Sequence, residues 1–289
     1  MASIRQLKSR IRSVKNTKQI TKAMQLVAAS KMRRAQDADK AAAPYTQAAS
    51  ELLTYLASQG VTDDHPLFEK RTVKKRMLIV IAADKGLVGA YNSNVMKAYI
   101  RELQADDKAA IGNTTIAIGR RVAQLTARLK DTDVAGVYTL LPDHPTGSEL
   151  NAILNTARTM FLAGVVDAVD IIYTEFINSI HQEVTVKRVL PAGFTETEVS
   201  ESVRDALYEP NVPEVLDSVA YRLVEAQIFQ ALLDAKASEY SMQMVAMKNA
   251  TDNASDLADD LTLAMNKVRQ GAITQELAEI SGGVEAMND

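Results

Sequence analysis

The sequence predicts an α/β protein: a long antiparallel two-helix coiled coil of N- and C-terminal helices, with an inserted, mainly parallel, Rossmann-like α/β domain. Residues 214–270 contain neither Gly nor Pro, and helical spacing also fills residues 3–58. Between these segments, short apolar runs alternate with helical patterns, which is typical of a parallel sheet covered by helices. We therefore expect a coiled-coil helix at 1–60, an α/β domain at 61–212 and a second coiled-coil helix at 213–289.

The N-terminal helix begins at a capping box, in which Ser3 precedes Gln6 by three residues. Its apolar positions recur in steps of three and four, with a slip near residues 15–19. Helical composition continues to about Ser58, and Pro44 either kinks the helix or marks a junction. The predicted contact positions are Ile4, Leu7, Ile11, Val14, Thr17, Ile20, Met24 and Val27.

The central part of the chain changes from helical spacing to strand patterns near Arg76. The last two predicted strands are joined by a short turn around residues 178–181, so we expect them to form an antiparallel hairpin. Residues 191–213 contain few apolar side chains and predict a loop. Strands are expected at 76–83, 114–118, 134–140, 169–176 and 182–190, of which 134–140 would be a short edge strand. Helices are expected from the loop after the first strand to about 104, at 120–129 and at 148–163.

The C-terminal helix has a heptad pattern, the spacing with which one helix wraps around another. A 57-residue helix would be about 85 Å long. Because the α/β domain is inserted between the two helices, they must run antiparallel, which places Ser3 opposite roughly Val268 and leaves about 20 residues beyond the pair. The expected contact positions in its second half are Met244, Met247, Thr251, Ala254, Ala258, Leu261, Met265 and Val268.

Positive charge is concentrated in residues 1–36, which hold ten Lys and Arg and no acidic residue, although the whole chain has a net charge of −3. A helix this basic favours an acidic partner. One alternative function is therefore a nucleic-acid-binding coiled-coil protein with a basic N-terminal helix. Against it, no aromatic residue that could stack on bases precedes Tyr45.

Several kinds of chemistry are excluded or disfavoured by the residues present. The chain has no Cys, and its three His residues are scattered without ligand spacing. The Gly-containing loop 83–92 lacks both nucleotide-binding fingerprints, so we expect a tight turn there rather than the cofactor site of a dinucleotide enzyme. No apolar run is long enough to span a bilayer. We expect no catalytic residue, no metal and no cofactor.

Residues 13–34 closely resemble the N-terminal signature of the γ subunits of F-type ATP synthases, and residues 247–253 and 266–277 resemble their C-terminal signature. The resemblance spans almost the whole chain. Gly271 departs from the family pattern, which usually has a residue that favours a helix more strongly at this position. Shorter matches in the same order are Asp84–Gly89, Phe176–Asn178 and Leu207–Pro210.

The resemblance implies a non-catalytic rotor subunit that couples rotation of a membrane ring to ATP synthesis or hydrolysis on β subunits. The implied partners are a hexamer of α and β subunits, an ε subunit and the c-ring. The implied location is peripheral, on the cytoplasmic face of a bacterial plasma membrane. By resemblance, Arg269, Gln270, Met24, Lys31 and Arg33 would contact a β subunit, and Tyr208 and Glu209 would contact the ring or ε.

Overall fold

A computed structural model describes most of the chain, and it divides into two compact units that are described separately below. Residues 1–28 with 244–289 form one unit, here called the terminal helix pair, and residues 29–243 form the other, here called the sheet-containing unit. The described residues are 3–62, 65–129, 132–143, 145, 147–193, 197–204, 209 and 211–288.

Two long helices contribute to both units. Helix α1 covers Ile4–Ser58 and helix α6 covers Val212–Asn288. The predicted capping box is confirmed, because the Ser3 backbone N–H donates to Gln6 Oε1 at 3.0 Å and the Gln6 N–H donates to Ser3 Oγ at 3.3 Å. Pro44 lies inside α1, which continues through it. The division of the chain at residues 60 and 212 stays a prediction.

The sheet has five strands in the order β3-β2-β1-β4-β5, and all neighbours are parallel except β4 and β5. The predicted mainly parallel sheet and its antiparallel hairpin are therefore confirmed. The segment expected to be a loop contains one short helix, α5. The bounds are β1 Lys75–Ile81, α2 Tyr91–Ala109, β2 Gly112–Ile118, α3 Arg120–Thr126, β3 Asp133–Tyr138, α4 Gly147–Leu162, β4 Ala168–Phe176, β5 Gln182–Leu190 and α5 Glu201–Arg204.

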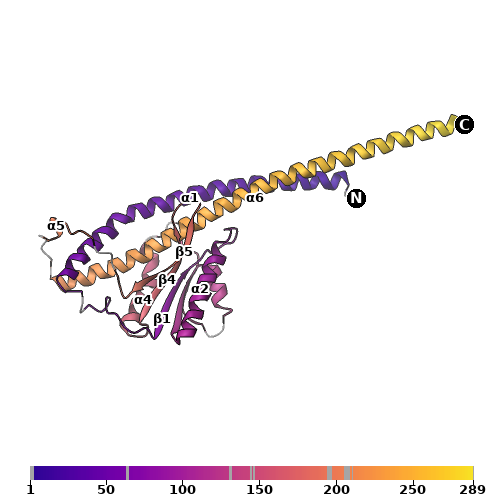
Figure 1. Ribbon diagram of the computed structural model, residues 1–289. Coiled ribbons are helices and arrows are strands. Elements are labelled where there is room, and N and C mark those ends of the chain that lie inside the picture. The colour runs from indigo at the N-terminus through magenta and orange to yellow at the C-terminus, as the bar shows by residue number, and fades with distance from the viewer. Residues whose placement is uncertain are drawn as a thin grey trace. The chain divides into compact units, whose positions relative to one another are not determined.

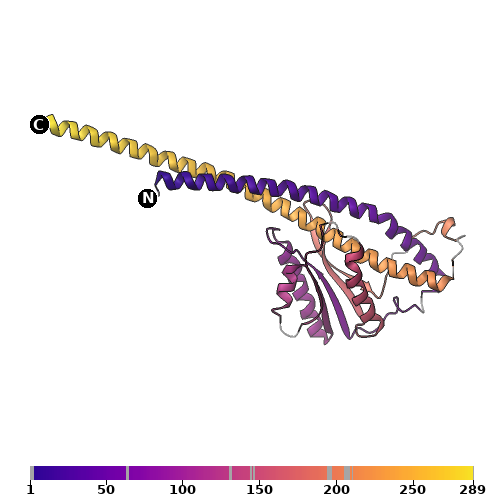
Figure 2. The same ribbon diagram turned by 180° about the vertical axis from the view of Figure 1, so that it is seen from behind.

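Helices cover both faces of this sheet. Successive residues of a strand point to opposite faces, so each strand contributes to two cores. Met77, Ile79 and Ile81 of β1 face a core shared with α4 and the first part of α6, whereas Leu78 and Val80 face a core shared with α2 and α3. In Figure 1 and Figure 2, α2 and α4 accordingly lie on opposite sides of the sheet. Burial on both faces explains why β1 is apolar at consecutive positions.

The part of α6 in the sheet-containing unit is buried on two sides. Val224 and Ile228 pack against the sheet. Leu216 and Leu223 pack instead against Leu53 and nearby apolar residues of α1. This part of α6 therefore has two apolar rows, one that contacts the sheet and one that contacts α1.

A buried charged side chain ties α2 to the sheet. Arg76 of β1 donates to Asp106 of α2 at 3.0 and 2.9 Å, and to Asp170 of β4 at 3.0 Å. Its third partner, Glu102, lies at 2.9 Å, and Arg188 of β5 also contacts Asp170. A buried charge needs such partners, because removing it from water is costly.

Candidate functional site

The terminal helix pair is held together along one face of α6. Met247, Thr251, Ala254 and Ala258 are buried there, with exposed fractions of 4 to 8%, and Leu261, Met265 and Val268 are half-buried. These positions follow the heptad read from the sequence, so the predicted contact face of this helix is confirmed. Thr251, Ala254 and Ala258 have small side chains, which let the two helices approach closely at these positions.

The contact face of α1 differs from the prediction after Val14. The prediction placed Thr17, Ile20 and Val27 in the contact, but Thr17 is exposed, and Ile20 and Val27 are 61% and 55% exposed. Met24, which was also predicted there, is half-buried. The heptad continues without the predicted slip. Beyond Val14, polar side chains occupy several of its contact positions, where the prediction placed mainly apolar ones. The buried or half-buried positions in residues 4–28 are Leu7, Ile11, Val14, Lys18, Thr21, Met24, Gln25 and Ala28.

Two polar contacts join the helices at these positions and set their register. Lys18 Nζ donates to Ser255 Oγ at 2.8 Å, and Thr251 Oγ1 lies 2.8 Å from Thr21 Oγ1. Polar side chains at contact positions of a coiled coil specify register at some cost in stability. Continuing this antiparallel register places the start of α1 close to Gln270 of α6, in agreement with the predicted position near Val268.

Beyond residue 270, α6 has an exposed apolar row. Ile273, Leu277 and Ile280 are 49%, 62% and 65% exposed, and their spacing puts them on one face of the helix. Arg269 and Gln270 are exposed at the beginning of this segment. A row of exposed large apolar side chains indicates a contact with another molecule.

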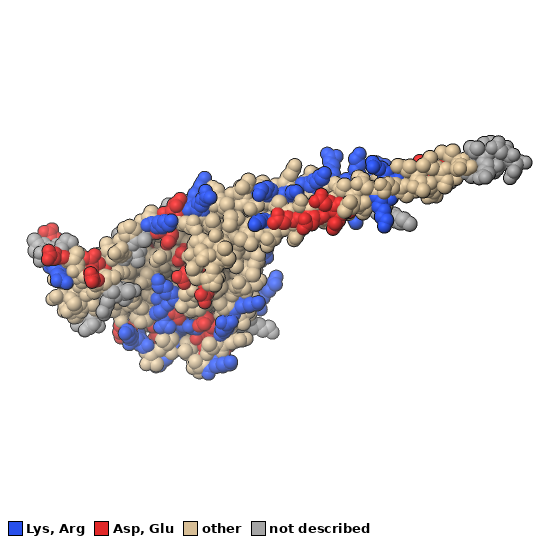
Figure 3. Space-filling model, turned by 45° about the horizontal axis from the view of Figure 1, so that its top comes forward, with Lys and Arg blue, Asp and Glu red and all other residues tan. Residues whose placement is uncertain are grey.

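Charges in the terminal helix pair are divided between its two helices. The first 28 residues carry basic side chains and no acidic one, whereas α6 has exposed acids between residues 252 and 260, and Figure 3 shows both groups on one face. Within the described residues, no ion pair joins the two groups. The two groups therefore do not neutralise each other through ion pairs. The α6 acids are Asp252, Asp256, Asp259 and Asp260.

Lys31 is engaged inside the sheet-containing unit. Its Nζ lies 2.6 Å from Asp143 Oδ2 and 5.5 Å from the ring centre of Tyr240, whose hydroxyl donates to the same carboxylate at 2.5 Å. Burial acts to raise the pKa of Asp143, but the hydrogen bonds from Lys31 and Tyr240 outweigh it and lower that pKa below its ordinary value. Lys31 thus has an internal partner that the sequence did not reveal.

The other predicted contact residues have different environments. Met24 is half-buried in the terminal helix pair, so only part of its side chain is accessible. Arg33 is exposed and lines a groove of about 510 Å³ together with Asp39 and Asp234.

Of the two residues predicted to face the ring or ε subunit, the structure describes one. Glu209 is exposed, whereas Tyr208 lies outside the described residues. No described contact assigns a role to Glu209.

The Gly-containing loop after β1 is held by its own hydrogen bonds. Gly89 has a φ of 56°, which favours glycine, and Asn92 Oδ1 accepts from the backbone N–H of Ala83 at 3.0 Å. Asp84 accepts from the N–H groups of Arg120 and Leu140 at 2.9 and 3.2 Å. The residues therefore form a tight turn, as predicted, and the carboxylate of Asp84 stabilises it. The absence of nucleotide binding stays a prediction.

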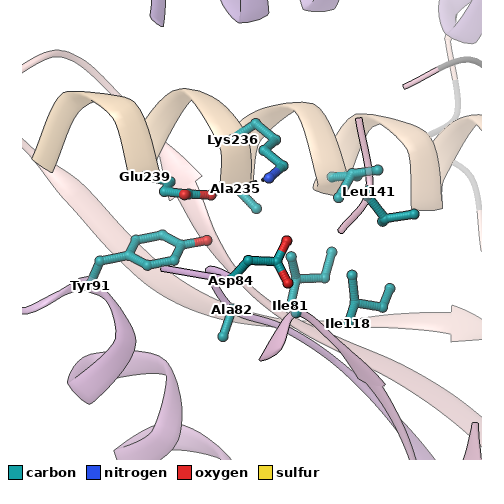
Figure 4. A pocket seen from close by; sticks show the side chains of 11 residues that line it. Ile81, Ala82, Asp84, Tyr91, Ile118, Leu141, Ala235, Lys236 and Glu239 are labelled. Carbon is teal, nitrogen blue, oxygen red and sulfur yellow. Dashed lines mark hydrogen bonds and ion pairs between the residues drawn. The ribbon is translucent and has the colours of Figure 1, made fainter. Parts of the chain in front are cut away.

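A small cavity next to this loop holds several titratable groups. Figure 4 shows Lys236 and Glu239 of α6 near Asp84 and Tyr91. Burial raises the pKa of Glu239 and of Tyr91. The cavity volume is only about 10 Å³, which is room for one water molecule at most.

The described part of the chain has neither a cluster of metal ligands nor a membrane-spanning helix. No group of three His, Cys, Asp or Glu side chains is placed to hold a metal ion. No described helix combines the length and the apolar character needed to cross a lipid bilayer.

The described features define a class of protein: an α/β unit inserted between two paired terminal helices, with one helix end exposed for a partner. A family model described as ATP synthase matches residues 3–287. An ATP synthase gamma chain from Stenotrophomonas maltophilia (strain R551-3) is 38% identical over 288 residues, covering 99% of this chain and 100% of the relative. One from Ralstonia nicotianae is 39% identical over 292 residues, with the same coverage of both chains.

Solved structures show the same fold. A chain of the Euglena gracilis mitochondrial ATP synthase has a TM-score of 0.68 at 19% identity, covering 98% of this chain and 94% of that one. A chain of the Tetrahymena thermophila central stalk and c-ring has a TM-score of 0.60 at 24% identity, covering 80% and 99%. The chain belongs to the ATP synthase γ-chain family.

Proposed function

We propose that this chain turns as the central-stalk rotor of an F-type ATP synthase, with the exposed end of α6 contacting the catalytic subunits. Family membership over nearly the whole length supports this function. The chain is a non-catalytic subunit, and ATP chemistry takes place elsewhere in the complex. The comparisons do not support the nucleic-acid-binding alternative.

The observation that carries the proposal is the exposed segment of α6 beyond the start of α1. Ile273, Leu277 and Ile280 provide apolar contacts there. Arg269 adds a planar fork of five N–H donors that suits carboxylates or backbone carbonyls, and Gln270 adds a donor and an acceptor. We infer that these two side chains meet a β subunit in one rotational state at a time.

The remaining contacts proposed for a β subunit lie on α1. Arg33 is exposed and available. Lys31 is still 34% exposed beside Asp143, so a partner carboxylate can share it, and the half-buried Met24 can contribute one edge of its side chain. An acidic surface on the partner fits the basic charge of this helix.

The other partners in the proposal are the α subunits, an ε subunit and the membrane c-ring. Glu209 and Tyr208 would face the ring or ε. The chain would then be peripheral, bound at the cytoplasmic face of a bacterial plasma membrane through the complex.

The test uses the chain assembled with α and β subunits. We expect Arg269→Ala with Gln270→Ala to leave assembly intact but to reduce multisite ATP turnover and proton pumping several-fold, because a state-specific contact is lost. The matched control is Asp107→Ala with Lys108→Ala, two exposed residues at the end of α2, which should change neither. Turnover and pumping equal to wild type in the first variant would rule out the proposed contact.

A further inference from the structure

The two edges of the sheet differ in how they are protected from other strands. On β5, Glu183, Lys187 and Arg188 are exposed charged side chains, and Gln182 Nε2 donates to Ser241 Oγ of α6 at 3.2 Å. Charges and a covering helix are the usual means of blocking an exposed edge. The charges on β5 therefore disfavour pairing with a further strand.

The opposite edge, β3, has little such protection. Its only charged residue is Asp133, at the first position, and Lys75 Nζ already pairs with it at 3.2 Å. Val134 and Val137 are 38% and 53% exposed. Because no described strand pairs with its outer side, alternate backbone N–H and C=O groups of β3 remain available to a partner.

An irregularity in the register brings both valines to one face. Val134 lies opposite Thr115 and Val137 lies opposite Ala117, with the shift falling between Thr115 and Ile116. Ala117 belongs to the core shared with α2 and α3. A regular strand would place residues three apart on opposite faces. The shift therefore puts both valines on the same face of the sheet, at its β3 edge.

Positive charge borders this apolar edge. Arg120, Arg121 and Arg128 are exposed in and directly after α3, the short helix on the same face of the sheet. The segment 120–128 has no acidic residue, and within the described part of the chain none of the three arginines forms an ion pair. A partner that places carboxylates beside this helix would be favoured.

We propose that the free edge of β3 is an interface that accepts one extended strand from another subunit of the complex. The strand that fits is uncharged and rich in β-branched or other apolar residues, with acidic residues beside it. Main-chain hydrogen bonds to β3 provide affinity in this mode of binding, and contacts with the two valines and the arginines provide specificity. The inference rests on the proposed function in that the partner belongs to the assembled enzyme.

Amide hydrogen exchange of the wild-type chain is the direct test, measured in isolation and in the purified, assembled ATP synthase. We expect exchange in residues 133–138 to slow at least tenfold on assembly, because the partner strand accepts hydrogen bonds from the outward N–H groups. Residues 182–190 serve as the internal control and should change little. Unchanged exchange in β3 within a verified complex would overturn the inference, whereas failure of the chain to assemble would overturn the proposed function instead.

A matched pair of variants tests the same edge by assembly. Val137→Lys places a charge at the β3 edge, and Val186→Lys does the same on β5, where the valine is 39% exposed and lies opposite Ile172 of the core shared with α2 and α3. We expect only Val137→Lys to weaken retention of the partner subunit, by about tenfold or more. Equal retention in both would contradict the proposal, as would β3 protection by anionic lipid vesicles alone. If Val137→Lys fails to fold, exchange in the wild-type chain still decides.

Discussion

The sheet-containing unit and the terminal helix pair use their charged residues in opposite ways. In the first, Arg76 is buried among three carboxylates and large apolar side chains fill both faces of the sheet. In the second, small and polar side chains such as Ala258 and Thr251 take part in the buried contact, and within the described residues no ion pair joins the basic side chains of α1 to the acidic side chains of α6. The charged residues of the first region stabilise its own fold, whereas those of the second are available to bind other molecules.

The largest effect should come from breaking the internal charge network. Arg76→Ala would leave the buried carboxylates of Asp106 and Asp170 without their main partner, so we expect the free energy of unfolding to fall by about 3–5 kcal/mol. Arg188→Ala is the control, because Arg188 contacts the same Asp170 but is 43% exposed, and should cost about 1 kcal/mol or less. Denaturant unfolding measures both. A loss below 1 kcal/mol for Arg76→Ala would show that the network contributes little.

A charge placed inside the helix pair should have the next largest effect. Ala258 is 4% exposed on the contact face of α6, so Ala258→Asp would bury an unpaired carboxylate at a cost of about 2–4 kcal/mol. We expect faster hydrogen exchange in residues 4–28, where α1 loses its contact. Leu263→Asp changes a residue of the same helix that is 69% exposed and should have no such effect. Similar exchange in both variants would argue against the paired-helix arrangement.

The smallest of these effects depends on pH. Burial, followed by the nearby carboxylates of Asp39 and Glu175, raises the pKa of Asp234 to about 7, from an ordinary value of 3.8. Between pH 4 and 7 the unfolded chain therefore releases a proton that the folded chain retains, so the free energy of unfolding falls as the pH rises. Asp234→Asn should remove about 1–2 kcal/mol of this dependence, less than the full shift because the site is partly solvated.

Urea unfolding at pH 4.5 and pH 7.5 measures that difference. Asp259→Asn, at an exposed residue of the same helix, is the control and should keep the wild-type dependence. The same pH dependence in Asp234→Asn as in the wild type would show that Asp234 is not the titrating group.

Much of the fold could be predicted because local patterns determine it. The strands, the hairpin and the contact face of α6 follow from runs of apolar residues at strand or heptad spacing. The contact face of α1 could not be predicted beyond Val14, since hydrogen bonds of Lys18 and Thr21 replace apolar packing there. Ile20 and Val27 keep the spacing of the predicted contact positions, but no described segment covers them.

The candidate site depended more on family resemblance than on physical reasoning. Spacing alone indicated that α6 extends beyond α1, and hence that Arg269 and Gln270 are exposed. The pairing of Lys31 with Asp143 joins residues far apart in the chain, and no local pattern shows such a contact. The strand order confirms that the strand predicted at 134–140 lies at an edge of the sheet, but the lack of protection on its free side was missed.

Rotation of single molecules tests most directly whether this chain is a rotor. The sequence has no Cys, so Lys108→Cys, at an exposed residue of α2, provides a unique attachment point for a bead. In a complex with surface-fixed α and β subunits, we predict stepwise rotation of the bead in one direction that requires ATP and stops when hydrolysis is inhibited. ATP hydrolysis at the normal rate by a complex that retains this chain, with no rotation of the bead, would contradict a rotor function.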